Sequence, residues 1–182
     1  MVAKKIDFAS IAEDQITLFI VPAKDYVEVD NELLHYFINV KKMGCIYVAA
    51  NKPAQLVNKI LENAKVNTEK IWYIDCVSGR VSSPHRIEKV IFLETPRDLT
   101  NMSIAITNFV KNMPEKSKML FIDSLTTLTI HNDINTIAKF THFIINQARN
   151  WGVSMALISI EEEAEAELIN KISIIVDKVV KL

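Results

Sequence analysis

The chain has 182 residues, a formal net charge of −1 and 49% hydrophobic residues. This length fits one domain, and the composition is that of a globular protein, which excludes disorder as the main state. Because the charge is near zero, there is no global basic field for a phosphate backbone, and we expect no nucleic-acid partner. Charged residues precede any long apolar run, and no uncharged apolar stretch approaches about 18 residues. We therefore expect no signal peptide, no membrane span and a cytoplasmic location.

The three glycines exclude the common phosphate-binding loops. Gly44, Gly79 and Gly152 are 35 and 73 positions apart. A dinucleotide-binding fingerprint needs three glycines within six residues, and a Walker A loop needs two glycines five apart before a lysine. Neither motif can be present. Cys45 and Cys76 are also too isolated to form a zinc-binding set, so we expect reduced thiols in the core.

In the first half of the chain, short apolar runs alternate with amphipathic segments. The apolar runs are continuous and rich in β-branched residues, which is typical of strands buried on both faces. Asp30 or Asn31 is expected to cap the first helix, and Gly44 to end it in a left-handed conformation. In chain order, the predicted elements are a strand at 16–21, a helix at 31–43, a strand at 45–50, a helix from 51 to 64 and a strand at 71–74.

The second half continues the alternation. Thr95 is expected to cap a helix, with a proline in its first turn and Asp98 as the acid three residues on. His131 and Asn132 are assigned to a loop, and Gly152 is expected to end a long helix. In chain order, the predicted elements are an extended segment or strand at 89–93, a helix at 95–113, a strand at 119–122, a helix at 134–151, a strand at 153–160, a helix led by the acidic run 161–167 and a strand at 174–182 broken by Asp177.

Strands that alternate with helices at this spacing predict a mostly parallel central sheet with helices on both faces, a three-layer α/β fold. No repeat or linker interrupts the pattern, so we predict a single domain over residues 1–182. In open parallel sheets, ligands bind beyond the carboxyl ends of the strands. The side chains at those ends are therefore the candidates for function.

The strongest candidate is Asp123, at the end of the apolar run KMLFID and before the small polar residue Ser124. A Walker B carboxylate has this form, because the Mg²⁺ of a bound nucleotide takes oxygen ligands at a strand end. Lys24, Asn51 and Lys52 follow two other predicted strands and are expected at the same edge. These five residues form a candidate nucleotide site, with Asp123 as its candidate Mg²⁺ ligand. An Asp after an apolar run also occurs as a simple loop cap, and that alternative stays open.

Two further features allow a functional and a structural interpretation. Arg80, His85 and Arg86 form a basic patch in a polar loop, which is either an anion or partner contact or a solvated loop. Phe140 and Phe143 lie off the main apolar stripe of their helix. If they are exposed, they indicate an oligomer contact.

Six segments occur in an order that is typical of one family. They are GCIYVAANKP (44–53), KIWYIDCVS (70–78), RDLTNMSIAITNFV (97–110), MLFIDSLTTL (119–128), INQARNWGVSMALIS (145–159) and IIVDKVVKL (174–182). From Gly44 onward, about three-quarters of its length, the chain resembles the KaiC-like branch of the RecA-type ATPases, of the kind found in archaea. The resemblance implies a RecA-like P-loop NTPase fold and side-by-side assembly into oligomers.

The departures from that family matter as much as the matches. Where the family has a glycine-rich GKT or GKS segment after its first strand, this chain has VPAKDYVEVDNELL, with Lys24 and no glycine. Without glycine the backbone cannot readily wrap around a phosphate. Where active relatives place a catalytic glutamate after strand two, this chain has Ala50, Asn51 and Lys52, and an amide cannot take a proton from water. We therefore expect a degenerate, non-catalytic domain without a cofactor.

The leading hypothesis is a pseudo-ATPase that acts by protein association, as a homo-oligomer or with a protein partner, in regulation or signalling. The second hypothesis is a nucleotide-binding protein that holds Mg-ATP or ADP at an atypical phosphate site using Lys24, Asn51, Lys52 and Asp123. The third is a small-molecule enzyme on a flavodoxin-like sheet. Nucleotide affinity distinguishes the second hypothesis from the other two.

Overall fold

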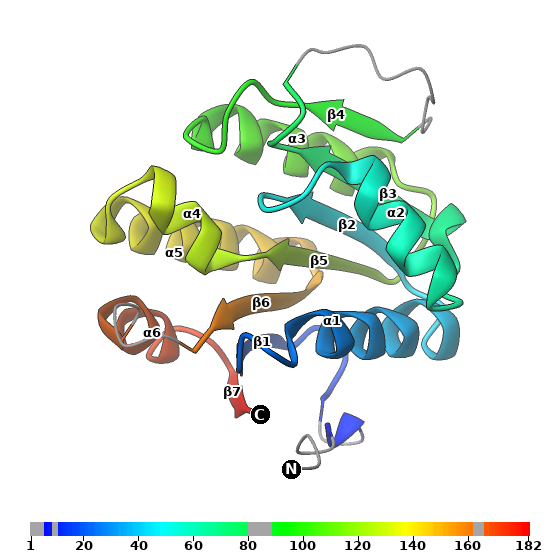
Figure 1. The fold of residues 1–182 in the computed structure, drawn as a ribbon, viewed down its shortest axis with the longest axis horizontal. Coiled ribbons are helices and arrows are strands. Elements are labelled where there is room, and N and C mark those ends of the chain that lie inside the picture. Colours follow the sequence, from blue (N-terminus) through cyan, green and yellow to red (C-terminus); the bar gives the residue numbers. More distant parts are fainter. Residues whose placement is uncertain (1–5, 9–10, 80–88, 162–165) are drawn as a thin grey trace.

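The computed structural model describes residues 6–8, 11–79, 89–161 and 166–182. Its centre is a seven-stranded sheet with the order β4-β3-β2-β5-β6-β1-β7, in which every neighbouring pair is parallel (Figure 1). This arrangement confirms the predicted α/β fold. The strands are β1 (Ile16–Val21), β2 (Gly44–Ala49), β3 (Ile71–Asp75), β4 (Val90–Phe92), β5 (Lys118–Asp123), β6 (Ser154–Ile160) and β7 (Lys178–Lys181).

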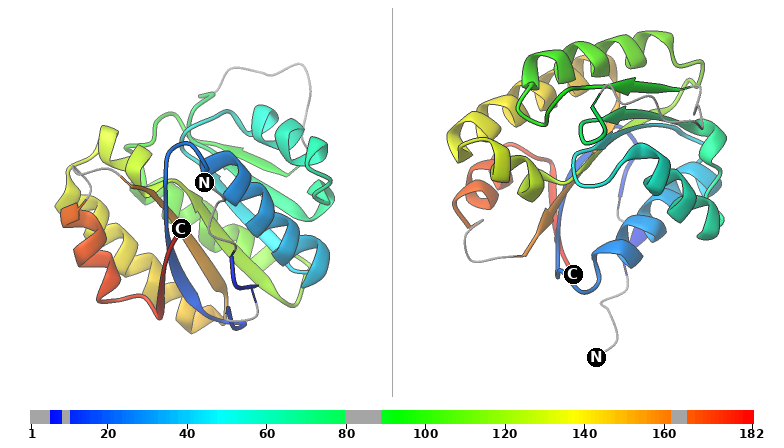
Figure 2. Two further views of the ribbon diagram at one scale, coloured as in Figure 1. Left: turned by 60° about the horizontal axis from the view of Figure 1, so that its bottom comes forward. Right: turned by 45° about the horizontal axis from the view of Figure 1, so that its top comes forward.

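Helices cover both faces of the sheet, as the two views of Figure 2 show. Side chains of α1 and α2 pack in one apolar cluster, and side chains of α3, α4, α5 and α6 pack in a second cluster across the sheet. None of the helices in the described ranges has the length and apolar character needed to cross a bilayer. The helices are α1 (Tyr26–Leu34) with a π-helical continuation η2 (His35–Val40), α2 (Ala54–Asn63), the 3₁₀ turn η3 (Thr68–Lys70), α3 (Leu99–Asn112), α4 (Leu125–His131), α5 (Ile134–Trp151) and α6 (Ala166–Ser173).

Alternation along the strands assigns each side chain to one of the two helical layers. In β2, Cys45 and Tyr47 belong to the cluster under α1 and α2, whereas Ile46 and Val48 belong to the opposite cluster. Both faces of β2 are buried along its whole length. This explains why its sequence is a continuous apolar run rather than an alternating one.

The first helix begins earlier than its sequence predicted. A turn closed by the Asp25 N–H donating to the Pro22 carbonyl at 2.9 Å leads directly into α1 at Tyr26. The apolar stripe of the helix extends back to Tyr26, so Asp30 lies in the second turn and is buried. The prediction that Asp30 or Asn31 caps this helix was therefore wrong.

Gly44 does not end the first helix either. It is the first residue of β2, and the left-handed residue near the helix end is Lys42, with φ of 62°. A Cβ at Gly44 would lie 2.7 Å from Met113 Sδ. The glycine is therefore explained by close approach of another segment and not by a helix end.

The local geometry tests three predictions for the second half of the chain. Gly152 ends α5 in a left-handed conformation with φ of 62°, as predicted. The cap of α3 is Asp98 and not Thr95, because the Asp98 side chain accepts a backbone N–H at 3.0 Å. Of the two residues predicted in a loop, His131 is the last residue of the short helix α4, which is capped by Ser124, and Asn132 follows that helix.

Candidate functional site

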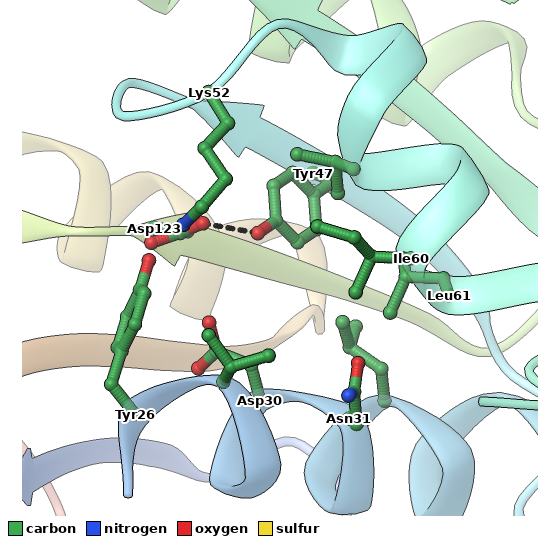
Figure 3. A pocket seen from close by; sticks show the side chains of 11 residues that line it. Tyr26, Asp30, Asn31, Tyr47, Lys52, Ile60, Leu61 and Asp123 are labelled. Carbon is green, nitrogen blue, oxygen red and sulfur yellow. Dashed lines mark hydrogen bonds between the residues drawn. The ribbon is translucent and has the colours of Figure 1, made fainter. Parts of the chain in front are cut away.

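A small cavity lies between α1, α2 and the carboxyl ends of β2 and β5 (Figure 3). Its polar lining consists mainly of Tyr26, Asp30, Tyr47, Lys52 and Asp123. The cavity volume open to the centres of water molecules is about 20 Å³. That is room for one water-sized species, so a nucleotide cannot enter without rearrangement of the walls.

Three elements and one loop bring these side chains together. Tyr26 and Asp30 lie one turn apart on the inward face of α1. Tyr47 comes from β2 and Asp123 from the end of β5, and both face the layer of α1 and α2. Lys52 reaches toward them from the loop between β2 and α2 (Figure 3).

The two oxygens of the Asp123 carboxyl group differ in their hydrogen bonding. The Tyr47 hydroxyl donates a hydrogen bond to Asp123 Oδ2, whereas Asp123 Oδ1 has no hydrogen-bond partner among the described residues. The residue is only 2% exposed. Burial raises the pKa of Asp123 to about 7, because removal from water disfavours the charged carboxylate.

Asp30 is a second buried carboxyl group in the same cavity. Burial raises the pKa of Asp30 well above its ordinary value, and the positive charge of Lys52 acts in the opposite direction. Lys52 Nζ lies 4.9 Å from the centre of the Tyr26 ring, within the range of a cation–π contact. Burial, followed by the charge of Asp30, also raises the pKa of Tyr47. The cavity therefore combines two carboxyl groups with a single ammonium group.

The structure places two of the five predicted site residues at this cavity. Lys52 and Asp123 line it, whereas Lys24 and Asn51 are exposed and do not. Ser124 is buried, and its hydroxyl accepts the Thr127 N–H at 3.2 Å, which caps α4. Within the described ranges, no group of three or more His, Cys, Asp or Glu side chains is placed to hold a metal ion. The basic patch of Arg80, His85 and Arg86 lies outside the described residues.

Sequence reasoning missed Tyr26, Asp30 and Tyr47. Asp30 was interpreted as a helix cap, and Tyr47 was treated as part of an apolar strand. The usable signal is the four-residue spacing of Tyr26 and Asp30, which places both on one face of a helix that starts at residue 26.

Another carboxylate at a strand end, Asp75, has a structural role. It is 1% exposed and accepts the N–H groups of Ala54 at 2.8 Å and of Val77 and Ser78 at 2.9 Å each. The Ser78 hydroxyl adds a fourth bond at 2.8 Å. Asp75 thereby caps the first turn of α2 and fixes the loop after β3.

Comparison with known proteins gives one family and one fold. The model of a protein family described as a family of unknown function (DUF7504) matches residues 41–182. No curated protein matches the chain significantly. Among solved structures, the crystal structure of KaiC-like protein PH0186 from the hyperthermophilic archaeon Pyrococcus horikoshii OT3 is similar, with a TM-score of 0.71 and 16% identity over 94% of this chain and 74% of that chain. At this identity the likeness establishes the fold, which is RecA/KaiC-like.

Proposed function

The chain belongs to the family of unknown function DUF7504 and has a RecA/KaiC-like fold, and we propose that it is a non-catalytic domain that acts by protein association. The observation that carries this proposal is the cavity at the ends of β2 and β5. Tyr26, Lys52 and two buried carboxyl groups line it, and it has room for one water-sized species. The phosphates of a nucleotide therefore find no space there.

The turn that precedes α1 supports the same conclusion. In the family that the sequence resembles, a glycine-rich loop binds phosphate at this point of the chain. Here a turn over residues 22–25 is closed by its own hydrogen bond, and the ring of Tyr26 follows it under Lys52. The segment over residues 21–34 contains no glycine that would permit close approach of its backbone to a phosphate.

The state of Asp123 also disfavours a metal-dependent reaction. A carboxyl group must be deprotonated to bind a cation, and the pKa of Asp123 is about 7. One of its oxygens is already engaged by the Tyr47 hydroxyl. A proton on Asp123 therefore competes with Mg²⁺ near neutral pH.

Exposed apolar side chains support a role in association. Ile104 of α3, Ile130 of α4 and Phe143 of α5 are 51%, 74% and 51% exposed, and all three belong to helices on the same face of the sheet. Burial of such exposed apolar side chains against another protein is favourable. We propose that this face binds a second copy of the chain or another protein.

A thermal unfolding scan with millimolar Mg-ATP and Mg-ADP tests the non-catalytic assignment. A nucleotide at about one hundred times its Kd would stabilise the protein by about 2.7 kcal/mol, which corresponds to a rise in Tm of roughly 5 to 11 °C. We expect no such shift and no release of phosphate from ATP. A shift that is lost in Asp123→Ala but kept in Asp25→Ala, a carboxylate outside the cavity, would instead establish the atypical nucleotide site.

A further inference from the structure

Three oxygen atoms for which the described part of the chain provides no hydrogen-bond partner point into one cavity. They are Tyr26 Oη, Asp30 Oδ1 and Asp123 Oδ1, from residues that are 5%, 6% and 2% exposed. Figure 3 shows the Tyr26 hydroxyl and the two carboxyl groups turned toward the same space. Buried polar atoms are normally paired, because an unpaired one carries the full cost of its desolvation. The three oxygens together therefore define a site for a hydrogen-bond donor.

The chemistry of this lining selects the kind of donor. Carboxyl oxygens accept hydrogen bonds, and an ionised carboxyl group is the stronger acceptor for a positively charged donor. A divalent metal ion fits poorly, because Mg²⁺ retains several waters and the cavity has room for one water-sized species. A primary ammonium group carries three N–H donors, which equals the number of unpartnered oxygens.

The walls of the cavity suit the remainder of such a ligand. Lys52 already places an ammonium group 4.9 Å from the centre of the Tyr26 ring, which shows that this ring can serve as a cation–π platform. The cavity itself has room for the ammonium group, so the alkyl chain takes the space that the displaced Lys52 stem leaves. Lys52 itself is half-buried and comes from a loop, so its side chain can leave without disturbing a helix or strand.

We propose that this cavity is a binding site for a small aliphatic amine, which displaces the Lys52 side chain and whose ammonium group donates to Tyr26, Asp30 and Asp123. In the free protein the Lys52 ammonium lies 4.9 Å from the centre of the Tyr26 ring and competes with the ligand for this space. This proposal goes beyond the association function, which concerns the face formed by α3, α4 and α5 and not the ligand of this cavity.

The test compares Lys52→Ala with the unmodified protein at pH 8, with propylammonium chloride as the probe. Sodium chloride at equal ionic strength and 1-propanol serve as the charge and shape controls. At ten times its Kd, propylammonium should raise the Tm of K52A by roughly 3 to 6 °C. The two controls should leave its Tm unchanged. The rise should be smaller in the unmodified protein, because Lys52 competes, and should be lost in the double variants K52A/D30N and K52A/D123N.

Two matched variants separate this site from general effects of charge. Lys52→Met removes the ammonium but keeps the stem, so the space stays filled and propylammonium should have no effect. Lys24→Ala removes an exposed lysine outside the cavity and should respond like the unmodified protein. If K52A does not fold alone, the yield of refolded K52A is measured instead. Propylammonium should raise this yield, and sodium should not. A response of K52A that is equal for propylammonium and sodium, or equal in K52A and Lys24→Ala, would overturn the proposal.

Discussion

The Tyr47 hydroxyl reaches Asp123 diagonally across two neighbouring strands. Tyr47 pairs directly with Phe121 in the register of β2 and β5, while Asp123 pairs with Ala49 two residues further on. The Tyr47 ring is held by stacking on Phe121, with ring centres 5.3 Å apart, and by contact with Tyr73 at 5.8 Å. The phenol is thus fixed against the carboxyl group before any ligand binds. Even so, burial dominates the electrostatics and keeps the pKa of Asp123 high.

Asp123 should make the stability of the protein depend on pH. Its pKa is about 7 in the folded protein against an ordinary value of 3.8, so the folded state retains a proton that the unfolded state has lost. The free energy of unfolding should therefore fall as the pH rises from about 4 to about 7. A difference of roughly 3 pKa units corresponds to about 4 kcal/mol. Urea unfolding at pH 5 and pH 8 should show a markedly smaller difference for Asp123→Asn than for the unmodified protein.

Asp98→Asn is the matched control for that measurement. The side chain and backbone N–H of Asn101 hold the pKa of Asp98 below its ordinary value, so Asp98 stays ionised from pH 5 to pH 8. This variant should shift stability equally at both pH values. Some pH dependence should remain in Asp123→Asn, because burial also raises the pKa of Asp30. If Asp123→Asn and the unmodified protein show equal pH dependence, the assignment of a raised pKa to Asp123 is wrong.

Tyr47→Phe should lower stability more at pH 8 than at pH 5. The variant removes the hydroxyl that donates to Asp123 Oδ2, which leaves an ionised carboxylate buried without that bond. Loss of a hydrogen bond to a buried charged group costs about 1 to 3 kcal/mol, and the cost falls when the carboxyl group is protonated. Tyr73→Phe is the control, since the Tyr73 hydroxyl donates to the amide oxygen of Asn58 at 3.1 Å, and its effect should be independent of pH.

Most of the strand order along the chain could be predicted from the sequence, because continuous apolar runs report burial on both faces directly. The helix boundaries could not be predicted equally well. Asp30 has the residue type of a cap, but packing of Tyr26 extends the helix by one turn and makes Asp30 an interior residue. The role of Gly44 depends on Met113, which is distant in sequence. Local signals contain no information on such contacts.

The candidate site was predictable only in part, for a similar reason. Asp123 and Lys52 follow strands, and the ends of parallel strands meet at one edge of the sheet, so their proximity follows from the fold class. Tyr26 and Asp30 enter the cavity from the helix that crosses over from β1 to β2. Their contribution depends on how that helix lies over the sheet. The charge balance of the cavity could therefore not be derived from the strand ends alone.

Asp75→Ala should be among the most destabilising substitutions at the ends of the strands. It leaves the N–H groups of Ala54, Val77 and Ser78 without their acceptor at a nearly inaccessible position. Because the Ala54 N–H is buried and the other two are partly buried, losing all three bonds predicts a decrease of about 3 kcal/mol in the free energy of unfolding. Denaturant unfolding measures it. Asp25→Ala should cost much less, because the Asp25 side chain makes no capping hydrogen bond, and a comparable loss there would contradict this explanation.

Gly44→Ala should destabilise the protein by overpacking. The added Cβ would lie 2.7 Å from Met113 Sδ and 2.9 Å from Glu115 Cβ, both closer than real contacts allow. Forcing atoms into such a packed position typically costs about 1 to 3 kcal/mol. Met113→Ala removes a buried side chain and is itself destabilising, but combined with Gly44→Ala it should cost less than the sum of the two single losses, because the clash with Sδ is gone. Thermal unfolding of the single and double variants tests this, and additive losses in the double variant would show that the Met113 contact is not responsible.

Phe143→Ser should weaken association and leave the fold intact. Phe143 is 51% exposed on α5, whereas Phe140 on the same helix is 8% exposed and belongs to the core. Replacing an exposed phenylalanine removes contact area from an interface without opening a cavity, so the Tm should change little. Sedimentation velocity over a concentration series should show a dimer or larger species for the unmodified protein and a lower mass for Phe143→Ser.

Val40→Ser is the control, since Val40 is 58% exposed on η2 on the opposite face of the sheet. Equal weakening by both variants would mean that general surface hydrophobicity, and not the face formed by α3, α4 and α5, drives the association. A protein that remains monomeric at every concentration would exclude the second copy as the partner and leave this face for a different protein.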